Sequence, residues 1–354
     1  MNTKRFSAAF THGSFAALLL ASLGAVSCIA NGSGDDAGLD GANVAGESVS
    51  AGNPLSGSTF FTDPNTEAAR QEGILRSQGR TSDANLIHKI ANHPQGYWVG
   101  DWESDPQGAV NNVVTRAGNQ VPILVPYNIP GRDCGSFSSG GTHNAQEYHD
   151  WIVKVSAGTG NHKVVVVLEP DALWLTAANS CAQVQGDLDV LHDAVYVIKS
   201  MNPHAQVYID AGSNGSPVST QTIADALFTA AVGHADGFAL NTSDSFATNA
   251  TVDRGKEISA LLAPKLGGRK MSFVIDTSRN GTGKAKGTGL ASWCNPTGLG
   301  LGKASTANTG EPLVDAFLWV KNPGQSDGTC DANNPPAGTW FEARALEMAR
   351  NANL

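Results

Sequence analysis

The chain has 354 residues, 41% of them hydrophobic, with 23 basic and 32 acidic residues and a formal net charge of −9. An N-terminal export segment containing only Lys4 and Arg5 would leave 21 basic against 32 acidic residues, a net charge near −11. Such an acidic protein has no electrostatic reason to bind nucleic acid or an anionic membrane, so we expect neither as a partner.

The first 27 residues have the layout of a secretory signal peptide, with basic residues before an apolar stretch from Phe15 to Val26. Cys28 stands where a bacterial lipoprotein is cleaved and lipidated, although Ala25 occupies a position where leucine is usual. Lipidation of Cys28 is one prediction, and ordinary signal-peptide cleavage is the alternative. Either way we expect an extracellular or cell-surface protein that contacts a membrane only through a lipid anchor.

Residues 28–57 are rich in Gly, Ser, Asn, Asp and Ala and contain almost nothing to bury. This composition predicts a flexible linker. No second linker interrupts residues 58–354, so we expect one large domain there, and a monomer.

Apart from Cys28, the chain has four cysteines: Cys134, Cys181, Cys294 and Cys330. An even number in an exported protein predicts two disulfides. A zinc site is the alternative, but no pair has CxxC spacing and no histidine lies close to any of the four. We therefore expect no metal.

The most informative stretch is Lys163 to Leu175, KVVVVLEPDALWL. Its β-branched run predicts a fully buried strand, and Pro170 ends it because proline cannot donate to a sheet. Glu169 and Asp171 then stand at the carboxyl end of the strand, where α/β enzymes hold their catalytic groups. The alternative is that Asp171 only caps a helix that begins near Ala172.

Similar strands recur, most of them followed by a segment with helical periodicity. The strand candidates are Tyr97–Trp102, Val121–Ile129, Lys163–Leu168, Gln206–Ala211, Gly237–Asn241, Met271–Asp276 and Asp315–Lys321. Helices are expected over residues 144–155, 187–200, 220–232, 255–266 and 340–351. This alternation predicts an α/β fold, a parallel β/α barrel, and the missing GxGxxG motif argues against a dinucleotide fold.

A polar residue follows nearly every strand: Asp101, Asp133, Asp171, Asp210, Asn241, Asp276, and Lys321 with Asp327. One such residue is a helix cap, but seven on one rim of a barrel predict an active-site cleft there. Aromatic residues lie close to these ends in sequence: Trp98, Trp102, Trp174, Trp293, Trp319 and Tyr127. Aromatic faces beside carboxylates suit a sugar ring, although core packing is the more common role for any single tryptophan.

Six motifs in order resemble glycoside hydrolase family 6. They are YNIPGRDCG (127–135), VLEPDAL (167–173), YIDAG (208–212), FVIDTSRNG (273–281), WCNP (293–296) and LWVKNPGQSDGTC (318–330). The resemblance covers the chain from Pro94 onward. It implies a cellulase that cleaves β-1,4-glucan with inversion on a distorted, seven-stranded β/α barrel, without metal or organic cofactor.

The resemblance also implies residue roles. Asp171 matches the general acid, Asp133 the aspartate that supports its raised pKa, and Asp327 a third aspartate sometimes proposed as base. Tyr127 matches a tyrosine that crowds the sugar at the cleavage point, and Ser139 a loop serine that places water. Trp98, Trp293 and Lys321 match glucose-binding positions, and Asn241, Asp210 and Gln325 are further predicted substrate-binding residues. The implied disulfides are Cys134–Cys181 and Cys294–Cys330.

Two departures from the family pattern concern the cleft. Gln325 stands where the family usually has glutamate, and Ser213 to Ser216 replace a histidine and a tryptophan on the leaving-group side. The loops over residues 276–293 and 298–310 are short, which favours an open cleft and internal cleavage. The sequence thus predicts an inverting endo-β-1,4-glucanase, with a cellobiohydrolase and a non-catalytic glucan-binding surface protein as alternatives. For inversion we expect the acid and the base about 6.5–9.5 Å apart.

Overall fold

The computed structural model describes residues 52–180, 187–283 and 289–354. The predicted signal peptide, Cys28 and Cys181 lie outside the described residues. Within them, no helix is long and apolar enough to cross a membrane.

Seven parallel strands form one sheet in chain order, and they confirm the predicted barrel strands. They are β1 (Gly96–Val99), β2 (Ile123–Pro126), β3 (Val164–Leu168), β4 (Ala205–Asp210), β5 (Gly237–Leu240), β6 (Ser272–Asp276) and β7 (Val314–Leu318). The sheet curls so far that its first strand meets the chain just beyond its last strand. There the Gly96 N–H of β1 donates to the carbonyl oxygen of Trp319, the residue after β7, at 2.8 Å. A Cβ on Gly96 would come within 2.4 Å of the Val320 carbonyl oxygen, so only glycine allows this approach.

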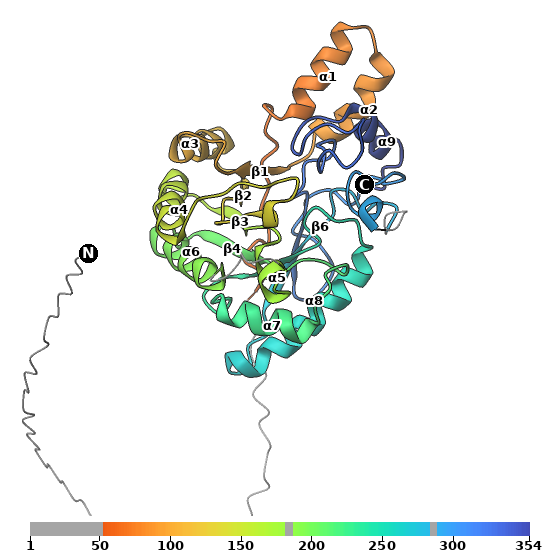
Figure 1. Ribbon diagram of the computed structural model, residues 1–354. Coiled ribbons are helices and arrows are strands. Elements are labelled where there is room, and N and C mark those ends of the chain that lie inside the picture. The colour runs from red at the N-terminus through yellow and green to blue at the C-terminus, as the bar shows by residue number, and fades with distance from the viewer. Residues whose placement is uncertain (1–51, 181–186, 284–288) are drawn as a thin grey trace, which may run out of the picture. The chain divides into compact units, whose positions relative to one another are not determined.

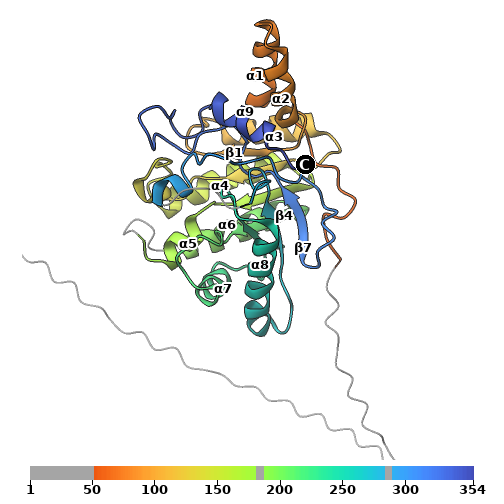
Figure 2. The same cartoon turned by 90° about the vertical axis from the view of Figure 1, so that its right-hand side faces the viewer.

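Helices cover the outside of the curled sheet (Figure 1). They are α3 (Pro106–Ala117), α4 (Ala145–Thr159), α6 (Asp187–Met201), α7 (Thr220–Thr229) and α8 (Thr248–Leu262), with the short α5 (Ala172–Ala177) directly after β3. Three further helices, α1 (Glu67–Ser77), α2 (Thr81–Ala91) and α9 (Glu342–Arg350), share a second apolar cluster that includes Trp319 (Figure 2). Single-turn 3-10 helices cover Asp133–Gly135, Ala263–Leu266 and Gly289–Ser292.

Strand β3 shows why its sequence is apolar throughout. Val165 and Val167 belong to the apolar cluster inside the barrel, whereas Val164, Val166 and Leu168 belong to the cluster beneath the helices. Because successive side chains point to opposite faces, both faces of this strand are buried.

Two expectations need correction. Leu55, which we had assigned to the linker, is fully buried in the interior cluster, so the folded domain begins before residue 57. Helix α8 begins at Thr248, earlier than the predicted residue 255, because its first turns carry polar residues that weaken the apolar period. Helices α1, α2 and α3 were not predicted.

Candidate active site

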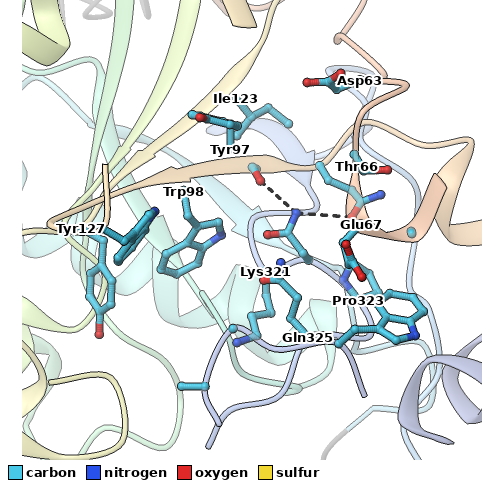
Figure 3. Close-up of a pocket in the computed structure, with 18 of the residues that line it drawn as sticks. Asp63, Thr66, Glu67, Tyr97, Trp98, Ile123, Tyr127, Lys321, Pro323 and Gln325 are labelled. Carbon is cyan, nitrogen blue, oxygen red and sulfur yellow. Dashed lines mark hydrogen bonds between the residues drawn. The ribbon is translucent and has the colours of Figure 1, made fainter. Parts of the chain in front are cut away.

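A cleft of about 700 Å³ runs along β1 and past the start of β2 to Tyr127 and Lys321, which follow β2 and β7. Asp133, Asp171 and Asp327 are not among the described residues that line it. Five residues predicted from the sequence line it, namely Trp98, Tyr127, Ser139, Lys321 and Gln325. Figure 3 labels all of these except Ser139. Trp102 and Trp340 also line the cleft. The sequence did not predict Trp340 as a cleft residue, because only the pairing of its main chain with Gln325 brings it there.

Trp98 and Tyr127 meet at right angles, with ring centroids 5.2 Å apart. The indole N–H of Trp98 donates to the carbonyl oxygen of Val320 at 2.8 Å. The tryptophan is therefore held between β1 and the segment after β7, with its ring at the cleft. A fixed aromatic face of this kind suits the C–H face of a sugar.

Asp171 follows β3 in a left-handed backbone conformation, with φ 72°. Its main-chain N–H donates to Oδ1 of Asp210 at 3.0 Å, and its Oδ1 accepts from the indole N–H of Trp174 at 2.8 Å. Burial, and then the negative charge of Asp210, raise the pKa of Asp171 to about 7. Its side chain caps no helix N–H, so the helix-cap interpretation is not supported.

Asp210 was predicted to bind substrate, but its side chain is only 1% exposed. Its Oδ1 accepts from the main-chain N–H groups of Asp171 and Gly212. Burial raises the pKa of Asp210 to about 6, against the lowering effect of hydrogen bonds to its carboxylate. In this structure the carboxyl of Asp210 therefore bonds to the main chain beside Asp171.

Asp133 lies on the loop after β2, at φ 58°, and its Oδ2 accepts from the main-chain N–H of Ser138 at 2.8 Å. Burial raises the pKa of Asp133 above its ordinary value. Burial also raises the pKa of Tyr127, and the negative charges of Asp171 and Asp133 raise it further. The tyrosine thus lies near both carboxylates.

Arg132, which the sequence did not single out, holds the loop that carries Ser139. Its guanidinium donates to the carbonyl oxygens of Tyr127, Ser138 and Ser139 at 2.7, 2.8 and 3.2 Å. It also pairs with Asp101 at 3.0 Å. The sequence does offer one signal for Arg132, because it is a charged residue directly before Asp133 of the motif.

Asp327 is buried and forms ion pairs with Arg279 and Lys321. Arg279 Nη1 lies 2.9 and 2.7 Å from its two oxygens, and Lys321 Nζ lies 3.2 Å from Oδ1. Burial raises the pKa of Asp327, but the charges of Arg279 and Lys321 outweigh it and bring the pKa below its ordinary value. This carboxylate is held ionised and is a weak proton acceptor.

Glu169, which the sequence placed with Asp171 at the carboxyl end of β3, is fully buried. It accepts from the main-chain N–H groups of Asn128 and Ile129 and from the Tyr148 hydroxyl. Burial raises its pKa to about 7. Glu169 thereby fastens the segment after β2, with Tyr127 and Asp133, to the end of β3.

The sequence profile of glycosyl hydrolases family 6 matches residues 55–352. The chain belongs to this family. It is 41% identical to endoglucanase A from Cellulomonas fimi over 304 residues, which is 84% of this chain and 62% of that relative. It is 35% identical to endoglucanase 1 from Streptomyces halstedii over 82% of this chain and 88% of the relative.

The fold comparison agrees with the family. The solved structure of the endoglucanase Cel6 from Mycobacterium tuberculosis, in complex with a methyl-cellobiosyl-4-deoxy-4-thio-β-D-cellobioside, aligns with a TM-score of 0.76 and 36% identity. The alignment covers 84% of this chain and 99% of that chain. The distorted parallel barrel is therefore the family 6 fold.

Two remaining predictions for this family 6 chain have different outcomes. Cys294 and Cys330 form the expected disulfide, with Cα atoms 6.2 Å apart, whereas Cys181, the expected partner of Cys134, lies outside the described residues. Asn241 was predicted to bind substrate, but it is fully buried. Its side chain bonds to the backbone of Phe246 and Asp276, so we assign it a structural role.

Trp293 is 42% exposed and lies against Phe137, with ring centroids 6.1 Å apart. Phe137 belongs to the loop held by Arg132, so this contact joins the loop after β2 to the region before the Cys294–Cys330 disulfide.

Among the described residues, no group of three or more His, Cys, Asp or Glu side chains is arranged to hold a metal.

Proposed function

We propose that this chain is a glycoside hydrolase that cleaves β-1,4-glucan with inversion of the anomeric carbon. The observation that supports this most is Asp171, a carboxylic acid at the end of β3 whose pKa is raised to about 7 by burial and by Asp210. Such a group is about half protonated at neutral pH and can act as a general acid. The names of the relatives, endoglucanases and cellobiohydrolases, support the same activity.

In the proposed reaction, Asp171 gives its proton to the glycosidic oxygen as the bond to the anomeric carbon breaks. A water attacks that carbon from the opposite face, and its proton leaves on the side of Asp133. We assign the acceptor role to Asp133 and not to Asp327, because the pKa of Asp133 is raised whereas that of Asp327 is lowered by its cations. Asp327 instead fixes Lys321 at the cleft.

We propose internal cleavage. The short loops over residues 276–293 and 298–310 leave little chain to roof the cleft. Four relatives at 35–41% identity are named endoglucanases, and a cellobiohydrolase C from Emericella nidulans is 30% identical. A cellobiohydrolase is therefore the second candidate.

We propose that the leaving-group side of the cleft is weakened, which would give the enzyme a preference for shorter or different β-glucans. Ser213 donates to Oδ2 of Asp244 at 2.6 Å, and its N–H donates to Oγ of Ser216 at 3.0 Å. The hydroxyls of Ser213 and Ser216 are thus engaged within the protein, and residues 213–216 include no aromatic side chain, so we expect weak binding of sugars on that side. Trp98, Lys321 and Gln325 would supply most of the binding on the opposite side.

The test compares viscosity loss with reducing ends released from carboxymethyl cellulose, for the wild type and Asp171→Ala. A steep viscosity drop with few new ends, reduced about 10²–10⁴-fold in the variant, supports internal cleavage with Asp171 as acid. Slow viscosity loss with cellobiose as product supports a cellobiohydrolase. If both proteins are inert on this polymer, on mixed-linkage glucan and on cello-oligosaccharides, the non-catalytic glucan-binding alternative replaces the enzyme.

We further propose that the mature chain is exported, monomeric and attached to a membrane through lipidated Cys28. Mass spectrometry of the mature protein tests this directly. An unmodified N-terminus beyond residue 28 rejects the anchor and leaves a secreted enzyme.

A further inference from the structure

Trp174 lies on the first turn of α5, three residues after Asp171. Residues three apart on a helical turn share one face, and here the indole Nε1 lies 2.8 Å from Oδ1 of Asp171. Among the described residues, Trp174 is the side chain that donates to this carboxyl. The contact is therefore the one that fixes the orientation of the carboxyl plane.

The indole is held from its other side by the main chain at Gly212. A Cβ on Gly212 would come within 2.9 Å of Cδ1 and 3.1 Å of Cγ of Trp174, so the ring lies directly against that backbone. The Gly212 N–H donates to Oδ1 of Asp210, which also accepts from the Asp171 N–H. Four residues thus form a closed ring of contacts: Asp171, Trp174, Gly212 and Asp210.

We propose that Trp174 is a positioning residue for the proton donor, because its indole N–H keeps Oδ1 of Asp171 as an acceptor and so leaves the transferable proton on Oδ2. A protonated carboxyl has one acceptor oxygen and one donor oxygen. An indole N–H can only donate, so the oxygen that it faces must be the acceptor. This inference rests on the proposed function, in which Asp171 is the acid.

The same bond also acts after the proton has left. Asp171 is then a carboxylate, and a hydrogen bond to an ionised acceptor is about twice as strong as one between neutral groups. Trp174 therefore stabilises the product form of the acid more than the reactant form. Breaking the bond should slow proton transfer and raise the pKa of Asp171, because the ionised state loses its donor.

The test uses Trp174→Phe, which keeps an aromatic ring but removes the N–H. The matched control is Trp151→Phe, since Trp151 is buried on α4 and its Nε1 has no hydrogen-bond partner among the described residues. Substrates are cellopentaose and a 2,4-dinitrophenyl β-cellotrioside, whose leaving group departs without a proton. For Trp174→Phe we expect kcat on cellopentaose to fall about tenfold with KM within about twofold.

Two readouts separate positioning from a general structural effect. On the dinitrophenyl substrate, Trp174→Phe should keep kcat within about twofold of the wild type, and on cellopentaose the alkaline limb of kcat/KM should move up by about one pH unit. Equal losses on both substrates, or an unshifted limb with unchanged kcat, overturn the proposal. Trp151→Phe should match the wild type in all of these measurements.

A second variant serves if Trp174→Phe folds poorly. Replacing Trp174 by β-(3-benzothienyl)alanine keeps the size of the ring and substitutes sulfur for the N–H, so packing against Gly212 is retained. Wild-type behaviour of that protein overturns the proposal. If instead the wild type itself has no activity on any β-glucan, the proposed function fails and not the assignment of Trp174 alone.

Discussion

The main-chain N–H of Asp171 donates to Oδ1 of Asp210 at 3.0 Å, which brings a second buried carboxyl beside the acid. The charge of Asp210 raises the pKa of Asp171, after the larger effect of burial. In Asp210→Asn the amide oxygen can still accept this bond, but the charge is gone. We expect the pKa of Asp171 to fall and the alkaline limb of kcat/KM to move to lower pH. An unchanged limb contradicts this assignment.

Arg279 and Asp327 form a pair whose side chains are 6% and 7% exposed. Arg279→Met leaves the carboxylate buried with Lys321 as its remaining cation, so we expect the free energy of unfolding to fall by about 3–5 kcal/mol. Urea unfolding measures this. The control is Arg70→Met, whose pair with Glu67 is solvent-exposed and should contribute little to stability because water and salt screen it. Similar effects in both variants contradict the prediction.

The Cys294–Cys330 disulfide closes a loop with a sequence separation of 36 residues. Loop-closure entropy for that length predicts about 4 kcal/mol of stabilisation. We expect the double variant Cys294→Ser, Cys330→Ser to lose about 2–4 kcal/mol in equilibrium unfolding and to weaken the position of Asp327, since Asn295 bonds to it. A variant as stable as the oxidised wild type contradicts this expectation.

Asp187 begins α6 with a side chain 2% exposed, and burial raises its pKa to about 7 from an ordinary 3.8. Between these values the unfolded chain is ionised while the folded protein keeps the proton. This group therefore lowers stability as pH rises from about 4 to 7, by up to about 1.4 kcal/mol per pH unit. Asp187→Asn should be more stable than the wild type at pH 8, with a smaller difference at pH 4. A constant difference between the two proteins over this range refutes the assignment.

The sequence predicted the seven strands because each is a short apolar run that ends in a polar residue. It predicted Asp171, Asp133 and Tyr127 through their motifs, and in the structure the charges of Asp171 and Asp133 both act on Tyr127. It did not predict α1 or α2, because their buried residues pack on α9 and Trp319, which are distant in sequence.

Side-chain roles were harder to predict than side-chain positions. Asn241 and Asp210 do follow strands as expected, but both are buried and bond to backbone groups. Strand alternation does not reveal whether a polar residue at a strand end points into the cleft or beneath it. Arg132 was missed because, apart from Asp101, its partners are main-chain carbonyls, whose positions cannot be read from the sequence.

That feature of Arg132 has an evolutionary consequence. Every residue type has the same carbonyl oxygen. The hydrogen bonds from Arg132 to residues 138 and 139 therefore do not depend on which side chains stand at those two positions. Substitutions at positions 136 and 138 can accumulate while the loop keeps its course, whereas Phe137 also packs on Trp293 and Ser139 has a predicted role in placing water. Libraries aimed at new polysaccharide preferences should therefore vary positions 136 and 138 and keep the arginine.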